Sequence, residues 1–151
     1  FELPAPGQDV PIKLSEQLKK GPVVLVVLRG FPGYQCPLCS RQIGQYLRQA
    51  EAFAKAGAQV ILVYPGPADE LETRAAEFMK GTTLPEGFHF VIDPGYVFTE
   101  AYGLRWDAPM ETAYPSTFVI DQESNVVFAK ISRTHGDRTT PDQVLEAIPT
   151  R

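Results

Sequence analysis

An unbroken run of six apolar residues, Val23 to Leu28, places the strongest constraint on the fold of this chain. Hydrophobicity that continues from residue to residue, rather than alternating, predicts a strand buried on both faces of a sheet. The run is far too short to span a membrane, which takes about 20 residues. A second apolar run, Val60 to Tyr64, ends at Pro65-Gly66-Pro67. Two buried strands separated by a helical pattern predict an α/β fold.

The helix between these strands is defined by one apolar stripe. Its residues recur at spacings of three and four, which places them on a single face. They are Cys39, Ile43, Tyr46, Ala50 and Phe53, and Gly57 follows as the expected residue just past the helix end.

The rest of the chain continues the alternation of strands and helices. Thr117–Ile120 and Val126–Ala129 form a predicted hairpin. A last helix follows Thr140 as N-cap, with Pro141 at its first position. The other predicted elements are short edge strands at 1–3 and 10–12, a short helix capped by Ser15, a helix bearing Leu71, Ala75 and Phe78, a strand from His89 to Ile92, and a short helix from about Val97 to Tyr102 ended by Gly103. This order predicts a mixed central sheet with helices on both faces.

Composition narrows the partners. The 151 residues are 44% hydrophobic, and 14 basic and 18 acidic residues give a formal charge of −4. Without a basic block to neutralise phosphates, we expect no nucleic-acid partner, and we expect no membrane partner. No signal peptide is visible, so the expected compartment is the cytoplasm. Because the chain starts at Phe1 rather than Met, the periplasm is the alternative if an N-terminal segment has been removed.

The only two cysteines stand three residues apart, in Cys36-Pro37-Leu38-Cys39, between the first buried strand and the helix. Proline favours the first helical position, so Cys36 is the predicted N-cap and Cys39 the third helical residue. Unpaired backbone N–H groups and the positive end of the helix dipole then favour the Cys36 thiolate. Cys39, one turn away, can resolve a mixed disulfide intramolecularly. The pair therefore predicts thiol chemistry.

Charge near the pair supports this interpretation. No Asp or Glu occurs from Gly21 through Cys39, and the nearby charges are Arg29 and Arg41. A zinc site would need further ligands, and neither His89 nor His135 has ligand-like spacing to the cysteines. No metal or organic cofactor is needed for the predicted chemistry.

Pro115 precedes the strand Phe118 to Asp121 and allows two interpretations. Because proline cannot donate to a β-ladder, it belongs at the start of this strand. Base rates favour an ordinary trans peptide bond. The alternative is a cis proline whose turn packs against the dithiol.

These motifs, in this order, resemble the thioredoxin-like superfamily, and within it the alkyl hydroperoxide reductase/thiol-specific antioxidant (peroxiredoxin) branch. The resemblance rests on residues 1–4, the strand and dithiol at 23–39, the segment from Ile92-Asp93-Pro94 to Tyr102-Gly103-Leu104, and Pro115 to Asp121. It implies a single thioredoxin-like/peroxiredoxin-like domain over residues 1–151. It also favours the cis form of Pro115.

The resemblance leaves the roles of the cysteines open. In peroxiredoxins a proline, three residues, Thr or Ser and two residues precede the peroxide-attacking cysteine. Pro32, Cys36 and Cys39 fit that spacing, which assigns attack to Cys39. The thioredoxin pattern makes Cys36 the attacking thiolate and Cys39 the resolver.

This chain lacks one expected residue of each pattern. Peroxiredoxins carry an arginine beside the site, and at the aligned position this chain has Pro115; Arg29, Arg41 or Arg133 are the candidate substitutes. Thioredoxins carry a buried acid in the strand before the dithiol, and Val23 to Leu28 contains none.

The predicted function is a thiol-dependent oxidoreductase that cycles Cys36 and Cys39 between dithiol and disulfide. Its substrate is a protein disulfide or a hydroperoxide. Its partner is an external dithiol donor, either a thioredoxin-like protein or a small thiol. Peroxiredoxin-like proteins often dimerise, so a homodimer is compatible with the resemblance. The alternative is a redox-sensing or redox-inactive interaction domain of the same fold. We expect Pro32, Pro37, Pro115, Arg29 and Arg41 to shape the site.

Overall fold

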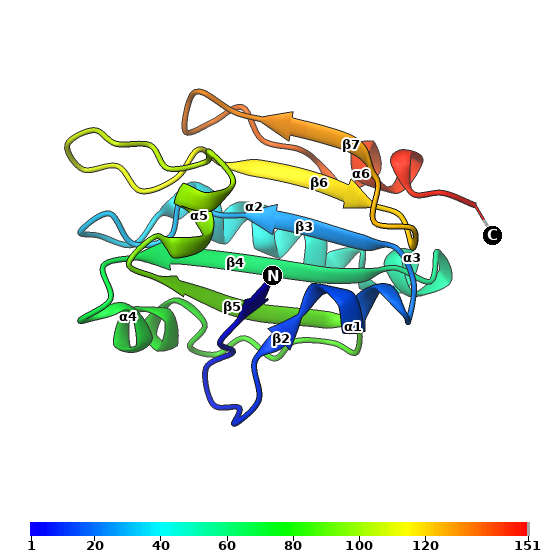
Figure 1. The fold of residues 1–151 in the computed structure, drawn as a ribbon, viewed down its shortest axis with the longest axis horizontal. Coiled ribbons are helices and arrows are strands. Elements are labelled where there is room, and N and C mark those ends of the chain that lie inside the picture. The colour runs from blue at the N-terminus through cyan, green and yellow to red at the C-terminus, as the bar shows by residue number, and fades with distance from the viewer. Residues whose placement is uncertain (151) are drawn as a thin grey trace.

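A five-stranded mixed sheet forms the centre of the molecule (Figure 1). The computed structural model describes residues 1–150. The strands are β1 (Glu2–Leu3), β2 (Ile12–Lys13), β3 (Val23–Val27), β4 (Gln59–Gly66), β5 (Phe88–Pro94), β6 (Ser116–Ile120) and β7 (Val126–Ile131). The helices are α1 (Leu14–Leu18), α2 (Pro37–Arg48), α3 (Ala50–Lys55), α4 (Leu71–Phe78), α5 (Val97–Ala101) and α6 (Pro141–Ala147).

The sheet has the order β5-β4-β3-β6-β7, so β3 is its central strand. β3, β4 and β5 are parallel, and β6 and β7 are added antiparallel. β1 and β2 form a separate two-stranded sheet. The mixed sheet expected from the sequence is therefore confirmed.

Alternate residues of β3 enter two different cores. Val24 and Val26 pack in a cluster with side chains of α2, α3, α4 and α6. Val23, Leu25 and Val27 pack with α1, α5, β1 and β2. In Figure 1, α1 and α5 lie in front of the sheet and α2 lies behind it. Helices on both faces explain why every residue of β3 is apolar.

Two helix predictions needed correction. The helix predicted to be capped by Ser15 begins at Leu14, with Lys13 at the N-cap and no side-chain cap. Its first N–H group, that of Leu14, instead donates to the carbonyl of Phe1 at 3.0 Å. The long stripe also spans two helices, because the backbone leaves helical geometry at Gln49, between α2 and α3. Its large side chains remain in one core.

Gly30 ties the segment after β3 to the neighbouring strand. The N–H of Leu28 donates to Val63 O, and that of Phe31 donates to Pro65 O. Gly30, between them, has a φ of +71°, and a Cβ there would lie 2.0 Å from Pro65 O. Only glycine lets the two backbones approach this closely. The chain therefore leaves the end of β3 at a defined place, a few residues before the dithiol.

The expected cis proline is wrong: no peptide bond within residues 1–150 is cis. The backbone around Pro115 is already held in extended pairing. The N–H of Tyr114 donates to Leu104 O at 2.9 Å, and the N–H of Ser132 donates to Pro115 O at 2.8 Å. A trans bond continues this pairing directly into β6, so Pro115 is an ordinary strand-entry proline.

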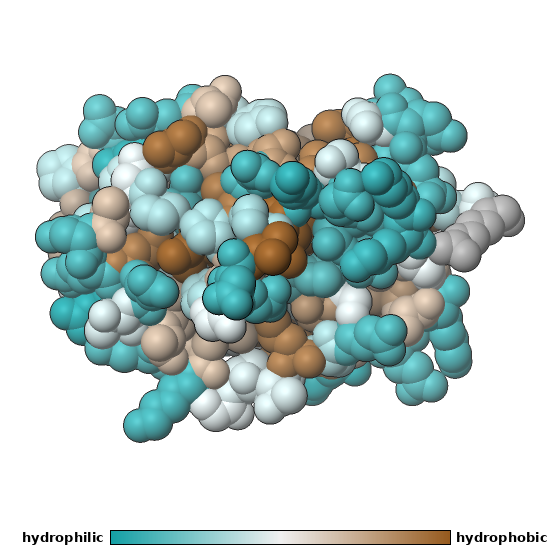
Figure 2. All heavy atoms as spheres, turned by 60° about the horizontal axis from the view of Figure 1, so that its bottom comes forward, coloured by the Kyte–Doolittle hydropathy of each residue, from teal (hydrophilic) through white to brown (hydrophobic). Residues whose placement is uncertain are grey.

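The side of the molecule drawn in Figure 2 is mainly hydrophilic, with its apolar side chains in small separated patches. Within residues 1–150, none of the helices combines the length and the apolar character needed to cross a bilayer.

Candidate active site

The two cysteines lie at the N-terminus of α2, as predicted. Cys36 is the N-cap, with extended backbone, and its Sγ accepts the N–H of Cys39 at 3.2 Å. Pro37 occupies the first helical position. Both thiols are free, and the Cys39 thiol donates to Cys36 Sγ across 2.6 Å. Because a disulfide bond is about 2.05 Å long, little movement separates the reduced pair from the oxidised one.

The surroundings lower the pKa of one thiol and raise the pKa of the other. The pKa of Cys36 is lowered to about 6, first by the hydrogen bond from the Cys39 thiol, then by the Cys39 backbone N–H and the positive charges of Arg138 and Arg29. Burial works against this lowering. Burial raises the pKa of Cys39, as does its bond to Cys36. One sulfur is thus a thiolate near neutral pH while the other holds its proton.

Arg138 contacts both sulfurs. Its Nη1 lies 3.4 Å from Cys39 Sγ, and its Nη2 lies 3.6 Å from Cys36 Sγ. It comes from the segment between β7 and α6, about 100 residues along the chain from the cysteines. No local motif surrounds Arg138, so its sequence neighbours do not mark it as a site residue.

Gln42 and Thr139 hold this segment against α2. Gln42 Oε1 accepts from Arg138 Nη1 at 3.2 Å, and its Nε2 donates to Thr139 O at 3.3 Å. Thr139 Oγ1 also lies 2.7 Å from the hydroxyls of Tyr46 and Thr117. Gln42 follows Cys39 by three residues, and on a helix that spacing places two side chains on one face. This spacing is the sequence signal that predicts Gln42 beside Cys39.

Arg29 lies near the site, but its hydrogen bonds go to groups other than the sulfurs. Its guanidinium is buried, donates to Tyr34 Oη at 2.6 Å and to Met110 O, and pairs with Glu111 at 3.1 Å. The other Glu111 oxygen lies 2.7 Å from His135 Nε2. Arg29 acts on Cys36 through its charge rather than through a contact.

The other two arginines considered as substitutes do not reach the cysteines. Arg41 is exposed and, within the described part of the chain, hydrogen-bonds neither sulfur. It follows Cys39 by two residues, a spacing that turns a helical side chain away. Arg133 stacks over the ring of Tyr114 at 4.4 Å. Of the arginines near the dithiol, Arg138 rather than Arg41 is therefore the one that contacts the sulfurs.

Pro32 and Pro115 lie near the end of β3 from which the dithiol segment departs. Pro32 is half-buried in the loop that leaves β3. Pro115 precedes Ser116, which pairs with Val27 at the end of β3 from which that loop departs. Pro115 and the start of the dithiol segment thus lie at the same end of the sheet.

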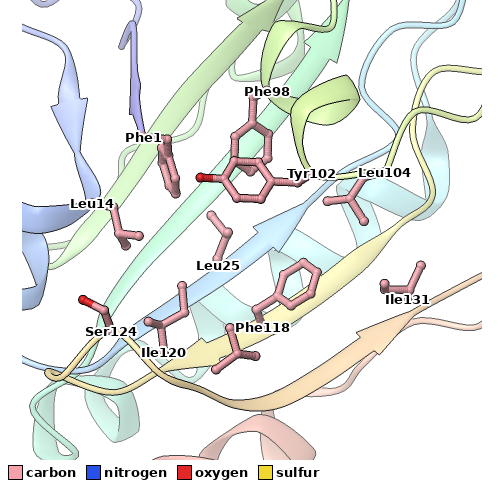
Figure 3. A pocket seen from close by; sticks show the side chains of 11 residues that line it. Phe1, Leu14, Leu25, Phe98, Tyr102, Leu104, Phe118, Ile120, Ser124 and Ile131 are labelled. Atoms are coloured by element: carbon pink, nitrogen blue, oxygen red, sulfur yellow. The ribbon is translucent and has the colours of Figure 1, made fainter.

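A cavity of about 310 Å³ lies on the opposite face of the sheet from the dithiol (Figure 3). Its walls are almost entirely apolar and include Phe98 and Tyr102 of α5 and its C-terminal cap, Leu25 of β3 and Phe118 of β6. Leu25 belongs to the core that excludes both cysteines. The cavity is therefore separate from the thiol site.

The unequal thiols predict a split pH dependence of alkylation. In the reduced protein, the rate of the first iodoacetamide modification is expected to rise through pH 6 and to level off above about pH 7, because Cys36 is then almost fully thiolate. Modification of Cys39 should remain slow and keep rising in alkaline solution. Mass spectrometry at timed intervals measures both phases. A Cys36→Ser control should lose the early phase, and a single midpoint near pH 8.5 would contradict the assignment.

Comparison with known proteins agrees with this fold. The family model described as Redoxin matches residues 1–146. Peroxisomal membrane associated protein 20 of Schizosaccharomyces pombe is 27% identical over 146 residues, covering 93% of this chain and 91% of that protein.

Two solved structures share the fold. Peroxidoxin BcpB from Mycobacterium tuberculosis superposes with a TM-score of 0.74 at 23% identity, over 97% of this chain and 90% of that one. The bacterioferritin comigratory protein of Xanthomonas campestris gives 0.72 at 18% identity, over 97% and 87%. With a Redoxin match over nearly its whole length and an adjacent cysteine pair at a helix N-terminus, the chain belongs to the Redoxin family and is a thiol-dependent oxidoreductase of thioredoxin-like fold.

Proposed function

We propose that Cys36 is the attacking thiolate and Cys39 the resolving cysteine of a thiol–disulfide oxidoreductase. One observation carries this assignment: both thiols are buried, but Cys36 Sγ receives a backbone N–H, a thiol proton and an arginine, whereas Cys39 Sγ receives only the arginine. Three donors around one sulfur favour its anionic form, and the anion is the nucleophile.

With a disulfide substrate, the Cys36 thiolate attacks one substrate sulfur, and the other leaves as a thiol after taking up a proton. Cys39 then loses its proton and attacks Cys36 Sγ, which expels the second substrate sulfur. The substrate gains two electrons and two protons, and the enzyme retains a Cys36–Cys39 disulfide. Because both cysteines belong to the first turn of one helix, the second step is intramolecular.

Hydroperoxide reduction is the second candidate. The Xanthomonas campestris neighbour is described as having alkyl peroxide reduction activity. Here the Cys36 thiolate would attack the terminal peroxide oxygen and release an alcohol or water. Cys39 would then displace water from the sulfenic acid and form the same disulfide. The positive charges of Arg138 and Arg29 support this step as well as disulfide exchange.

In either case an external dithiol donor must reset the disulfide, and we propose a thioredoxin-like protein or a small thiol for that role. Location in the cytoplasm or the periplasm stays a prediction, and so does a homodimeric state. Fractionation of the native host and light scattering of the purified protein test them.

A mass experiment separates the candidate substrates. The reduced protein is treated with one equivalent of hydrogen peroxide or of a small disulfide, and its intact mass is followed with time. Loss of two hydrogens within seconds is expected with the disulfide, because the Cys36 thiolate is already formed. An equally fast loss with peroxide would establish the second candidate. Inertness to both would overturn the enzyme assignment in favour of a redox-inactive interaction domain.

A further inference from the structure

We propose that Arg138 is a catalytic residue that serves both sulfurs in turn: it holds the thiolate at Cys36 before attack and receives the thiolate released at Cys39 when the disulfide is reduced. The proposal rests on the proposed function, since it assigns a group to each half of that cycle. It also places the activating arginine in the segment after β7 rather than at the strand-entry position of Pro115.

The geometry fits two sulfurs and one guanidinium. The two terminal nitrogens of Arg138 point to different cysteines, Nη1 to Cys39 and Nη2 to Cys36, at 3.4 and 3.6 Å. A guanidinium presents its donors in a rigid planar fork, so both contacts can exist at once. Bonds from a charged donor are roughly twice as strong as neutral ones.

The positive charge of Arg138 is available to the sulfurs. Within residues 1–150, Arg138 forms no ion pair with a carboxylate. Glu111, which lies beyond His135 in the same network, is engaged by Arg29 and His135, and the neighbouring Asp137 pairs with Lys130. The remaining partners of Arg138 are neutral: Gln42 Oε1, and the carbonyl of His135, which accepts from Nε at 2.6 Å. These acceptors orient the fork without neutralising it.

The release of Cys39 is the step that most needs this charge. Cys39 is fully buried, and burial raises the pKa of its thiol. A thiol of high pKa is a poor leaving group in disulfide exchange. The strand that precedes the dithiol contains no acid or base, so Arg138 is the charged group in contact with the departing sulfur.

The reductive half-reaction balances as follows. A donor thiolate attacks Cys36 Sγ, the Cys36–Cys39 bond breaks, and its electron pair goes to Cys39 Sγ beside Arg138 Nη1. Cys39 then takes a proton from water. The second donor thiol attacks the donor sulfur of the mixed disulfide and releases Cys36 as a thiolate beside Nη2. The donor dithiol loses two electrons and becomes a disulfide.

The two half-reactions can be tested separately, because neither cysteine can ionise in the disulfide form. The rate of reduction of oxidised protein by dithiothreitol at a fixed pH therefore depends on the leaving sulfur and not on the ionisation of a free Cys36 thiol. Thiolate absorbance of the reduced protein against pH reports on Cys36. In Arg138→Met we expect the Cys36 pKa to rise by about 1 to 2 units and the reduction to slow by about 10-fold.

Arg41→Met is the matched control, because it removes an exposed arginine from α2, the helix that bears the cysteines. Both values should stay at wild-type levels. If Arg138→Met fails to fold by circular dichroism, Arg138→Lys carries the test. Lysine is shorter and lacks the planar fork that presents one nitrogen to each sulfur, so we expect at least one of the two changes in that variant as well.

The outcomes are distinguishable. A wild-type protein that cannot be cycled between dithiol and disulfide would overturn the proposed function itself. A wild-type protein that cycles, with both values unchanged in Arg138→Met, would overturn only the role of Arg138. A raised pKa with an unchanged reduction rate would overturn the part of the proposal that concerns Cys39.

Discussion

Replacing Cys36 with serine is expected to lower turnover by at least about 1,000-fold, because the variant lacks the attacking sulfur. The fold should be retained, since a serine hydroxyl at the N-cap of α2 can still accept the Cys39 N–H. Thermal unfolding of the reduced variant checks this point. Steady-state reduction of a small disulfide by dithiothreitol measures the loss.

Cys39→Ser is the informative partner of this variant. It keeps the Cys36 thiolate but has no sulfur to resolve the intermediate, so one equivalent of an aromatic disulfide should leave a stable adduct on the protein. Wild-type protein under the same conditions should show no adduct and a loss of two hydrogens. Intact mass distinguishes the two results.

The reverse pattern would contradict the assignment of the cysteines. An adduct that forms on Cys36→Ser, and not on Cys39→Ser, would make Cys39 the nucleophile. That result would match the spacing of Pro32, Cys36 and Cys39 in the peroxiredoxin pattern. It would also mean that the less exposed of two buried thiols reacts first.

Gly30→Ala should produce the largest loss of stability among the loop substitutions. The new Cβ would lie 2.0 Å from the carbonyl oxygen of Pro65, and the residue would have to adopt a φ of +71°. Backbone strain and overpacking together are expected to cost about 2 to 5 kcal/mol of unfolding free energy. Urea unfolding followed by far-ultraviolet circular dichroism measures this loss.

Gly81→Ala separates the two contributions. Gly81 has a similar φ of +78°, but no atom lies within 4 Å of the position of its Cβ. The control should lose only the conformational cost, about 1 kcal/mol. Equal losses in the two variants would show that the approach of β4 to the segment after β3 is unimportant.

The features that could be predicted from the sequence are those decided by near neighbours. The burial of β3 on both faces follows from its own side chains. The start of α2 follows from Pro37, and the start of α6 from Thr140, which forms a capping box with Gln143. In each case the determining contacts lie within a few residues.

Arg138 illustrates what could not be predicted. Its position beside the dithiol depends on the antiparallel addition of β6 and β7 to the sheet, and on the bonds of Thr139 to α2 and β6. None of these contacts can be inferred from the residues next to Arg138 in the sequence. Arg41 is a different case: helical spacing alone excludes it, and the same reasoning would have identified Gln42.

Pro115 shows a limit of reasoning from family resemblance. The motif around it fits the strand-entry position of thioredoxin-like proteins, but its peptide bond is trans. Local pairing with Leu104 and Ser132 determines the backbone there, and the resemblance did not contain that information.

Trp106, the only tryptophan of the chain, gives the protein an optical probe of its own. Its ring stacks on Tyr114 and lies 5.2 Å from the ring of His135, whose carbonyl holds Arg138 against the sulfurs. A change at the dithiol that shifts Arg138 also alters the surroundings of the indole, so its fluorescence can follow the redox cycle without an added label.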